Sequence, residues 1–484
     1  MFMYFVYVNM LHNTFTSDHI GVYATRHNDQ LNPFSNYISG GRFMLFFLDR
    51  LGWILNKIGI SEYQYQFILQ LILLLFLAIS ITILYLLFSG FFYNQISKTI
   101  LFFVLLVSFV NPYFVEIFVY KGYQLGIGIL LAILAVYCAA KNKCILGSIL
   151  IFMSVAVYQS FFSVFIIFYT TYIYFECKGR IRGAQIKKEL VALLMVAVPL
   201  VINLLIIRVF IIGGQIDKEI KQVSAPSIIS FHERLLSIGE AIKIAMVTCF
   251  GMMPKLFVVI FLCVIIIITL TQMKKLNYCI FDLVIYIVYF FVISAYCFVI
   301  FLAMQHPSYV VVARIVWPMF VMISCMLLSM LFYTQSQIKQ LVIPLLVVFY
   351  VVDLFFTEGC ITDFIMTNKL DKSVVCSVKS EINEYERVTG NRIKYVAAKN
   401  SDNPEYYHHS YTLISYSAAT YNHKVLYDDW SKVELLNYLT DSQYRKIDMP
   451  ESVFKEYFGG KTWDTFNASE QLVFDGDTMY WVIY

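Results

Sequence analysis

The sequence predicts a polytopic α-helical membrane protein of about eleven transmembrane helices, followed by a small soluble α/β domain at its C-terminal end. Of the 484 residues, 60% are hydrophobic and 14% are charged, against roughly 25% charged in an ordinary soluble domain. A soluble fold could not bury that much apolar surface, so a bilayer must cover much of it. The net charge of +4 is too small and too dispersed to indicate a nucleic-acid partner.

Apolar runs of spanning length follow one another over the first 356 residues, which we take as the transmembrane domain. The first run, residues 1–11, is short for a span of about 20 residues. It has neither a basic region before it nor a cleavage site, so no removable signal peptide is predicted. Ten further runs lie at 64–88, 99–118, 123–140, 144–158, 160–175, 190–212, 255–271, 278–304, 311–333 and 341–356.

The orientation of the helices follows from Lys and Arg in the short loops. Basic residues gather at 141–143, at 178–188 and at 274–275, and these loops alternate with the spans so that all three fall on one face. We interpret that face as cytoplasmic. The opposite face then carries residues 17–63, the turn 120–124, residues 213–254, residues 305–308 and the C-terminal tail.

Two of the outside loops contain amphipathic segments, at 41–59 and 227–246. Each alternates apolar with charged residues in a pattern typical of a helix lying in the membrane interface. Such helices are expected beside a site that holds a lipid head group at the surface. Ordinary amphipathic connectors are the alternative interpretation.

The composition changes abruptly at residue 357, and residues 357–484 are polar and rich in tyrosine. Mixed runs predict strands at 393–398, 411–416 and 480–483 and helices at 431–438 and 452–457. This length supports a small α/β or α+β domain. Cys360 and Cys376 either form a disulfide, if the tail faces an oxidising compartment, or remain free thiols.

The first outside loop is the densest group of ionisable residues at the predicted membrane edge. It holds Asp18, His19, Arg26, Asp29 and Arg42. A short carboxylate just beyond a transmembrane helix can deprotonate an acceptor hydroxyl as general base, and Arg can hold a phosphate. Asp18 can equally cap the segment that follows it.

Three further outside positions carry candidate site residues. Glu116 is followed by Tyr120 and Lys121 near the outer end of an apolar run, and it acts either as a second acid or as a structural partner of Lys121 or of a first-loop Arg. Gln159 binds sugar hydroxyls or satisfies backbone groups. His306 and Arg314 occupy a fourth turn, where Arg314 suits a phosphate or extends to the interface as a snorkelling side chain.

All four positions face the outside in a topology derived from the loop charges alone, and this predicts one extracytoplasmic site. A transporter would instead place polar residues near the middle of the membrane in broken helices. The middles of most spans are apolar, apart from Asn203 and Asp282.

These residues together resemble the Gtr-type serotype-converting O-antigen glucosyltransferases. The motifs are Ser17-Asp18 with Arg26 and Gly41-Arg42, then Asn111-Pro112-x-Phe114-x-Glu116 with Tyr120, and Tyr158-Gln159. The order of the spans and the terminal outside domain are also similar, so the resemblance covers nearly the whole chain. The chain departs from the family at His19, where a second acid is usual, and this leaves Asp18 and Asp29 as alternative bases.

The resemblance implies a GT-C fold in the bacterial inner membrane with its site facing the periplasm. It implies an inverting transfer of glucose from undecaprenyl-phosphate glucose to O-antigen repeat units of lipopolysaccharide, which converts the serotype. Asp18 or Asp29 would be the base, Arg42 and Arg314 would hold the donor phosphate, and Glu116 and Gln159 would bind sugar hydroxyls. The tail domain would help hold the polysaccharide, with exposed tyrosines such as Tyr406, Tyr407 and Tyr411 stacking on sugar rings or packing in the core.

Other functions are compatible with parts of this pattern. Another lipid-phosphate-sugar-dependent transferase would use a similar set of residues, whereas a polysaccharide flippase would show inverted repeats, which are absent from the sequence. A membrane scaffold would need no acid at position 18. No sequence pattern resembles a cation-binding site, so we predict a reaction without a metal or other cofactor.

Overall fold

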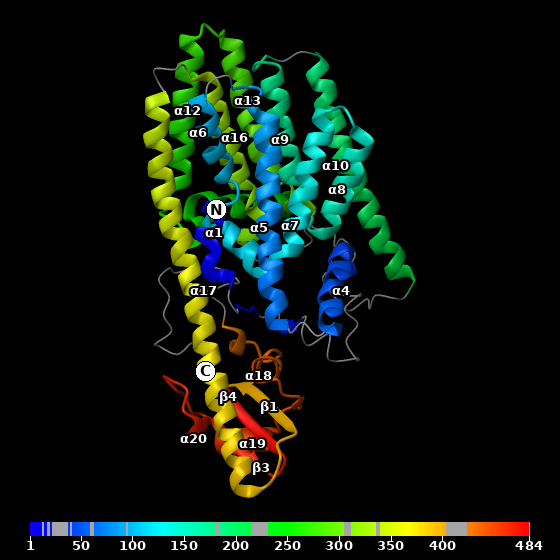
Figure 1. The fold of residues 1–484 in the computed structure, drawn as a ribbon, viewed down its shortest axis with the longest axis vertical. Helices are drawn as coiled ribbons and strands as arrows, with labels where there is room; N and C mark the ends of the chain where they lie inside the picture. Colours follow the sequence, from blue (N-terminus) through cyan, green and yellow to red (C-terminus); the bar gives the residue numbers. More distant parts are fainter. Residues whose placement is uncertain are drawn as a thin grey trace. The chain divides into compact units, whose positions relative to one another are not determined.

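A computed structural model shows a mainly helical protein that divides into two compact units (Figure 1). The structure describes residues 1–11, 14–16, 20–21, 37–38, 41–58, 62–92, 95–180, 183–213, 231–303, 311–334, 339–402 and 424–483. The first unit, here called the membrane unit, comprises Met1–Leu11, Asn32–Glu358 and Tyr416–Ala418. The second, here called the C-terminal unit, comprises His12–Leu31, Gly359–Ser415 and Ala419–Tyr484.

Within the described residues, seven helices are long and apolar enough to cross a membrane. They are α5 (Glu62–Ser89), α7 (Pro112–Ala140), α10 (Gly183–Ile212), α12 (Phe257–Lys275), α13 (Ile280–Phe298), α15 (Ala313–Val316) continuing into α16 (Pro318–Tyr333), and α17 (Lys339–Thr389). Shorter apolar helices are α1 (Phe2–Tyr7) with η1 (Val8–Leu11), α8 (Cys144–Val157) and α9 (Phe161–Glu176). A polytopic helical membrane protein is thereby confirmed, while the total of eleven spans remains a prediction.

Helix α16 lies at the centre of the membrane unit, where it packs against α9, α12, α13 and α6 (Gln95–Leu106). Every residue of α16 except Phe332 is buried. At the periphery of the membrane unit, α10 exposes large apolar side chains such as Leu204, Leu205 and Val209. This distribution suits a bundle whose outer surface meets lipid and whose inner helices meet other helices.

The predicted run 99–118 and the predicted turn at 120–124 are both wrong in detail. Helix α6 ends at Leu106, and α7 begins at Pro112 and continues without interruption to Ala140. The Asn111 side chain accepts a hydrogen bond from the Phe114 N–H, and Pro112 stands in the first turn. An Asn cap followed by Pro is a strong helix start, and this local signal overrides the continuous hydropathy of residues 99–118.

Both predicted amphipathic segments are helical. The first contains α4 (Phe43–Lys57), and the second contains α11 (Phe231–Ile242), which continues into the π-helical η3 (Lys243–Thr248) and the short η4 (Cys249–Gly251). A further short helix, α14 (Ile300–Ala303), follows α13. Asp282, predicted to lie mid-span, is instead in the first turn of α13, where its carboxylate accepts from the Cys279 N–H at 3.1 Å.

Helix α17 continues through the change in composition at residue 357 and ends at Thr389. Polar side chains along it bond back to the helix, as Thr357 does to the Asp353 carbonyl at 2.7 Å and Thr367 to the Asp363 carbonyl at 2.8 Å. Cys360 and Cys376 both lie on this helix, 16 residues or about 24 Å apart along its axis. A disulfide between them is therefore excluded, and both are free thiols.

The C-terminal unit contains a four-stranded mixed sheet in the order β2-β1-β4-β3. The central strand β1 (Tyr395–Asn400) is parallel to β2 (Arg445–Lys446) and to β4 (Thr478–Ile483), and β3 (Leu472–Asp475) is antiparallel to β4. Around it lie η5 (Val425–Tyr427), α18 (Lys432–Thr440), α19 (Glu451–Tyr457) and α20 (Ala468–Gln471). The predicted strands at 393–398 and 480–483 and both predicted helices match these elements, whereas 411–416 lies outside the described residues.

Candidate functional site

The first half of α7 presents a polar stripe in the membrane unit. From the Asn111 cap, successive turns place Glu116, Tyr120 and Gln124 at four-residue intervals. Residues four apart lie on the same helix face. The stripe therefore faces one set of neighbours, and each of its members binds a different part of the chain.

Glu116 binds Arg314, which lies on the short helix α15. The Arg314 main-chain N–H donates to Oε2 of Glu116 at 2.7 Å, and its Nη1 donates to Oε1 at 2.8 Å. The Glu116 side chain is 0% exposed and that of Arg314 is 15% exposed. Both carboxylate oxygens are thus engaged by one residue, which favours the structural alternative for Glu116 over general acid or base chemistry.

Tyr120 lies between two arginines. The guanidinium carbon of Arg314 is 4.2 Å from the centre of the Tyr120 ring, and Nη1 of Arg42 donates to the Tyr120 hydroxyl at 3.0 Å. Arg42 also lies over the ring of Tyr158, at 4.8 Å from its centre. Cation–π contacts of this kind hold a guanidinium in place without neutralising its charge.

The turn that precedes Arg42 is fixed by Gly41, whose φ of +67° belongs to the left-handed region. The Gly41 carbonyl accepts a hydrogen bond from Nδ2 of Asn203 on α10 at 3.0 Å. A methyl group at Gly41 would lie 2.7 Å from Nε2 of Gln159 and 3.0 Å from Oδ1 of Asn203. Only glycine fits here, and Gln159 and Asn203 thereby lie beside the Arg42 turn.

Helix α4, which follows Arg42, is attached to α7 at a second place. The buried carboxylate of Asp49 accepts hydrogen bonds from the Gln124 amide and from the Tyr37 hydroxyl. The Tyr123 hydroxyl donates to the Leu48 carbonyl at 2.6 Å. The carbonyl of Tyr37 in turn accepts from the Arg42 N–H at 2.8 Å, so the Asp49 contacts connect directly to the arginine.

Comparison with protein families identifies the chain. A family model described as glucosyl transferase GtrII matches residues 12–330, which is about two thirds of the sequence. The chain belongs to this family. Comparisons with curated proteins and with solved structures gave no match.

Membership of the GtrII family makes this protein a glucosyltransferase embedded in the membrane by its apolar helices. It confirms the resemblance to Gtr-type glucosyltransferases drawn from the sequence motifs. The matched region includes all ten predicted site residues and ends before α17 begins.

The structure brings together five of the predicted site residues of this GtrII protein: Arg42, Glu116, Tyr120, Gln159 and Arg314. Predicted residues Asp18, Asp29, Arg26 and His306 lie outside the described residues, as does the side chain of Lys121. Glu116 pairs with Arg314, which was not among the partners that the sequence suggested.

Sequence reasoning missed the role of Asn203 and of Asp49. Asn203 stood out as a polar residue within the apolar run 190–212, which was the available signal. Asp49 lies one helical turn beyond Leu45, which is fully buried, so it is a carboxylate on the buried face of an amphipathic helix. Within the described ranges no group of three His, Cys, Asp or Glu side chains is arranged to hold a metal ion.

Arg42, Arg314 and Glu116 together carry one net positive charge. Glu116 offsets Arg314, whereas no described carboxylate pairs with Arg42. A guanidinium presents several donors in a planar fork that matches the oxygens of a phosphate. The site can therefore bind one negative charge on a group that also meets aromatic rings and an amide.

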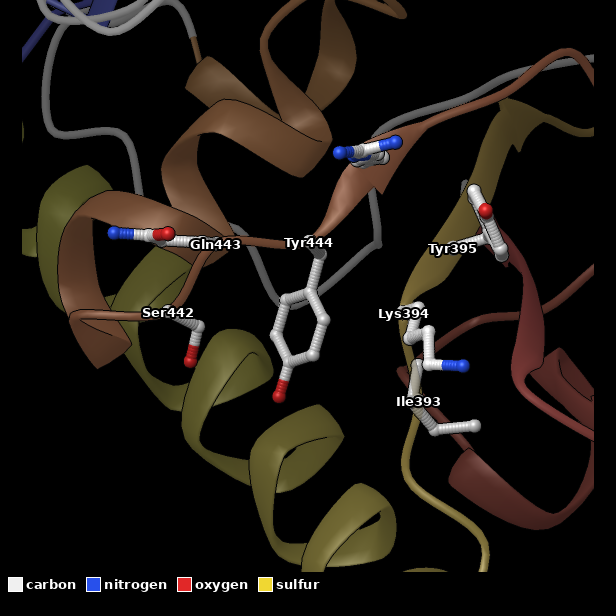
Figure 2. Close-up of a pocket in the computed structure, with 7 residues that line it drawn as sticks. Ile393, Lys394, Tyr395, Ser442, Gln443 and Tyr444 are labelled. Atoms are coloured by element: carbon white, nitrogen blue, oxygen red, sulfur yellow. The ribbon is translucent and has the colours of Figure 1, made fainter.

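A separate hollow of about 460 Å³ lies on the C-terminal unit (Figure 2). Its lining residues come from the start of β1 and from the segment that leads into β2; they are Ile393, Lys394, Tyr395, Ser442, Gln443, Tyr444 and Arg445. The lining carries no carboxylate and none of the predicted site residues.

Proposed function

We propose that this GtrII protein transfers glucose from undecaprenyl-phosphate glucose to O-antigen repeat units on the periplasmic face of the inner membrane. The family supplies the glucosyl transfer, while the lipid donor, the acceptor, the GT-C fold and the membrane face are the proposed part. The observation that carries the proposal is the Arg42 guanidinium, which is held by Tyr120 and Tyr158 and has no carboxylate partner among the described residues.

The charges of donor and site match. A sugar joined to a polyprenyl phosphate is a phosphodiester and carries one negative charge. The charge of Arg314 is balanced by Glu116, whereas no carboxylate among the described residues pairs with Arg42, which supplies one positive charge. A nucleotide-sugar donor, with two phosphates and at least two negative charges, would call for more cations or a metal ion.

The proposed reaction is a displacement at the anomeric carbon with inversion. The acceptor hydroxyl attacks that carbon, the bond from the carbon to the phosphate oxygen breaks, and undecaprenyl phosphate leaves. The hydroxyl proton passes to the carboxylate of Asp18, with Asp29 as the alternative base. The departing phosphate gains a second negative charge, and Arg42 stabilises this charge as it develops.

The remaining predicted residues have supporting parts in this proposal. Tyr120 orients Arg42, and Gln159 binds a hydroxyl group of the glucose. Arg26, His306 and Lys121 bind substrate, Lys121 from helix α7, and the C-terminal unit helps to hold the polysaccharide. The tyrosines at 406, 407 and 411, proposed to stack on sugar rings, lie outside the described residues. No cofactor takes part.

Substitution of Arg42 tests the donor site. Arg42→Met removes a charge-assisted hydrogen bond worth about 1.5–3 kcal/mol, so the KM for undecaprenyl-phosphate glucose should rise roughly 10- to 150-fold. Arg50→Met is the matched control, because Arg50 lies on α4, the helix that follows Arg42, and its guanidinium carbon also lies over an aromatic ring, that of Phe46, at 4.8 Å from the ring centre. Equal effects of the two substitutions would remove the case for a phosphate at Arg42.

The donor and the acceptor are tested by structural analysis of surface polysaccharide. Cells that make undecaprenyl-phosphate glucose are compared with and without the protein and with the Asp18→Asn variant. A glucose branch that appears with the wild type and disappears with Asp18→Asn, at equal membrane abundance, supports the proposal. A branch that persists moves the base to Asp29. No branch under any condition would reject glucose transfer to O-antigen and favour another lipid-phosphate sugar or another acceptor.

A further inference from the structure

The hollow on the C-terminal unit lies between two segments whose backbones are fixed by hydrogen bonds. Oδ1 of Asn437 on α18 accepts from the Tyr444 N–H, and its Nδ2 donates to the Tyr444 carbonyl, both at 2.9 Å. On the other side, the Asp477 carbonyl accepts from the Lys394 N–H at 2.8 Å. The Arg445 N–H donates to the Lys394 carbonyl at 2.8 Å and joins the two sides. The fold therefore forms this hollow in advance, as it does for most small-molecule sites.

Two tyrosines give the hollow aromatic surface. Figure 2 shows Tyr444 on one side of the hollow and Tyr395 on the other. Tyr444 is 9% exposed, and Tyr395 is half-buried. A tyrosine ring offers an apolar face and a polar hydroxyl, and this combination suits a sugar, whose C–H groups form an apolar face with hydroxyls around its edge. The volume of about 460 Å³ lies within the range of small-molecule pockets.

Lys379 on α17 places a positive charge beside Tyr444. Its ammonium nitrogen donates to the Tyr444 hydroxyl at 2.7 Å and to Oγ of Ser442 at 3.3 Å, and it lies 5.2 Å from the centre of the Tyr444 ring. These partners are neutral, so they do not offset the charge. The Tyr444 hydroxyl accepts from the lysine, and its own proton has no acceptor among the described residues. Such a polarised hydroxyl is a strengthened donor, which suits an anion in the hollow.

Cations outnumber carboxylates around the hollow. Arg445 lines it and has no carboxylate partner in the described part of the chain. Lys394 pairs with Asp477 at 3.5 Å, and Glu386 meets the lining through a main-chain N–H at 2.8 Å. Two carboxylates thus contact a group of residues that, with Lys379, carries three cations. Because a guanidinium matches a carboxylate in a planar fork, the hollow suits a ligand with one negative charge.

We propose that this hollow binds an acidic sugar of the acceptor polysaccharide through the carboxylate of that sugar. Arg445 and Lys379 attract the carboxylate, the Tyr444 hydroxyl donates to it, and the ring of Tyr395 packs against the sugar. The proposal rests on the polysaccharide acceptor proposed above and names the chemical class of one of its sugars. A sugar acid uses both the charge and the aromatic surface of the hollow, whereas the phosphate of a lipid head group would use the charge alone.

The test measures sugar binding by the full-length protein in nanodiscs of phosphatidylcholine, a lipid without net charge. The probes are trisaccharides of galacturonic acid and of glucuronic acid. Each is compared with its carboxyl-reduced form, which keeps the same rings and linkages and has no charge. At least one acidic trisaccharide should bind, and its reduced form should bind at least about tenfold more weakly. Added salt should weaken only the acidic form.

Neighbouring residues of β2 provide matched variants. Successive side chains of a strand point to opposite faces, and Arg445 lines the hollow whereas Lys446 does not. Arg445→Gln should weaken binding of the acidic trisaccharide about tenfold or more. Lys446→Gln removes the same charge and should change binding less than about twofold. Tyr444→Phe keeps the ring but loses the donating hydroxyl, so it should weaken binding about 2- to 10-fold.

Several outcomes would overturn the proposal. They are equal binding of the acidic and reduced forms, no binding of either acid, and equal effects of Arg445→Gln and Lys446→Gln. Glycerol phosphate serves as a probe for a lipid head group. If it binds in an Arg445-dependent manner while neither acidic trisaccharide binds, the hollow is a phosphate site and not a sugar site.

These measurements need neither donor nor glucosyl transfer. Failure of the wild-type protein to transfer glucose would count against the proposed function, and the binding data would still decide what the hollow holds. Conversely, transfer without binding of either acidic trisaccharide would leave the proposed function standing and remove the role of the hollow.

Discussion

Arg314 donates two hydrogen bonds to Glu116, one from its main-chain N–H and one from its guanidinium. The first fixes the start of α15 against α7, and the second places the guanidinium over the ring of Tyr120. The Glu116 carboxylate thus fixes the positions of both the backbone and the side chain of an arginine 198 positions away. Arg42 donates a hydrogen bond to the hydroxyl of the same tyrosine. Tyr120 therefore fixes the spacing of the two cations.

Removing one member of this pair should destabilise the protein more than removing both. Arg314→Met leaves the fully buried Glu116 carboxylate without its cation, which costs on the order of 3–5 kcal/mol. The double variant Glu116→Gln/Arg314→Met has no uncompensated charge and should regain most of the lost stability. The measurement is the apparent midpoint of thermal unfolding in detergent, and equal midpoints for the single and double variants would contradict the prediction.

Gly41→Ala should lower both stability and glucosyl transfer. A left-handed conformation costs a residue with a side chain roughly 1–2 kcal/mol, and the added methyl would also meet Gln159 and Asn203. The expected result is a lower unfolding midpoint together with weaker donor binding, because the turn that carries Arg42 must shift. Gly239→Ala is the control. Gly239 is inside α11 with open space at its Cβ position, so this change should stabilise the helix by about 0.5–1 kcal/mol.

The carboxylate of Asp49 and the amide of Gln124 attach α4 to α7, and exchanging them should restore the stability and activity that Gln124→Glu alone removes. Gln124→Glu places a second carboxylate against Asp49, and the repulsion should release α4 and reduce transfer. The double variant Asp49→Asn/Gln124→Glu restores an amide opposite a carboxylate, with their places exchanged. We expect a coupling energy of about 1–3 kcal/mol in the double-mutant cycle of unfolding free energies. A double variant that is no more stable or active than Gln124→Glu would show that this contact does not hold the helix.

The C-terminal unit should become more stable as the pH rises above 8. Burial lowers the pKa of Lys424 to about 8, although attraction to Asp371 opposes this shift. In the unfolded chain the pKa of Lys is about 10.4. Between these two values the unfolded state binds more protons than the folded state, so the free energy of unfolding rises with pH and levels off above about 10.4. Below pH 8 Lys424 is protonated in both states, and the folded state must bury its positive charge.

Hydrogen exchange of the β1 and β4 amides between pH 7 and 10 measures this dependence, after correction for intrinsic exchange rates. Lys424→Met removes the titrating group, so the difference in protection between variant and wild type should be largest near pH 7 and shrink toward pH 10. A difference that stays constant across this range would show that Lys424 does not titrate there.

Hydropathy and local signals determined much of the fold. The apolar runs became helices because a bilayer leaves backbone groups no partner except their own helix. Two of the errors of detail arose where polar residues interrupt an apolar run. The segment Tyr120–Gln124 was predicted as a turn, yet its tyrosine and amide bind Arg42 and Asp49 from within α7. At residue 357 the polar side chains bond back to their own helix, which lets α17 continue.

The sequence by itself determined that the protein is a polytopic membrane protein, and its motifs indicated a glucosyltransferase site built from outer-loop residues. Only the tertiary structure decided the pairings: Glu116 with Arg314, Arg42 with Tyr120, Asn203 with Gly41, and Asn368 with Phe15. The physical reason is distance along the chain. Helix formation depends on neighbours within about four residues, whereas these contacts join residues more than 70 positions apart. They depend on how the helices pack, which no local pattern specifies.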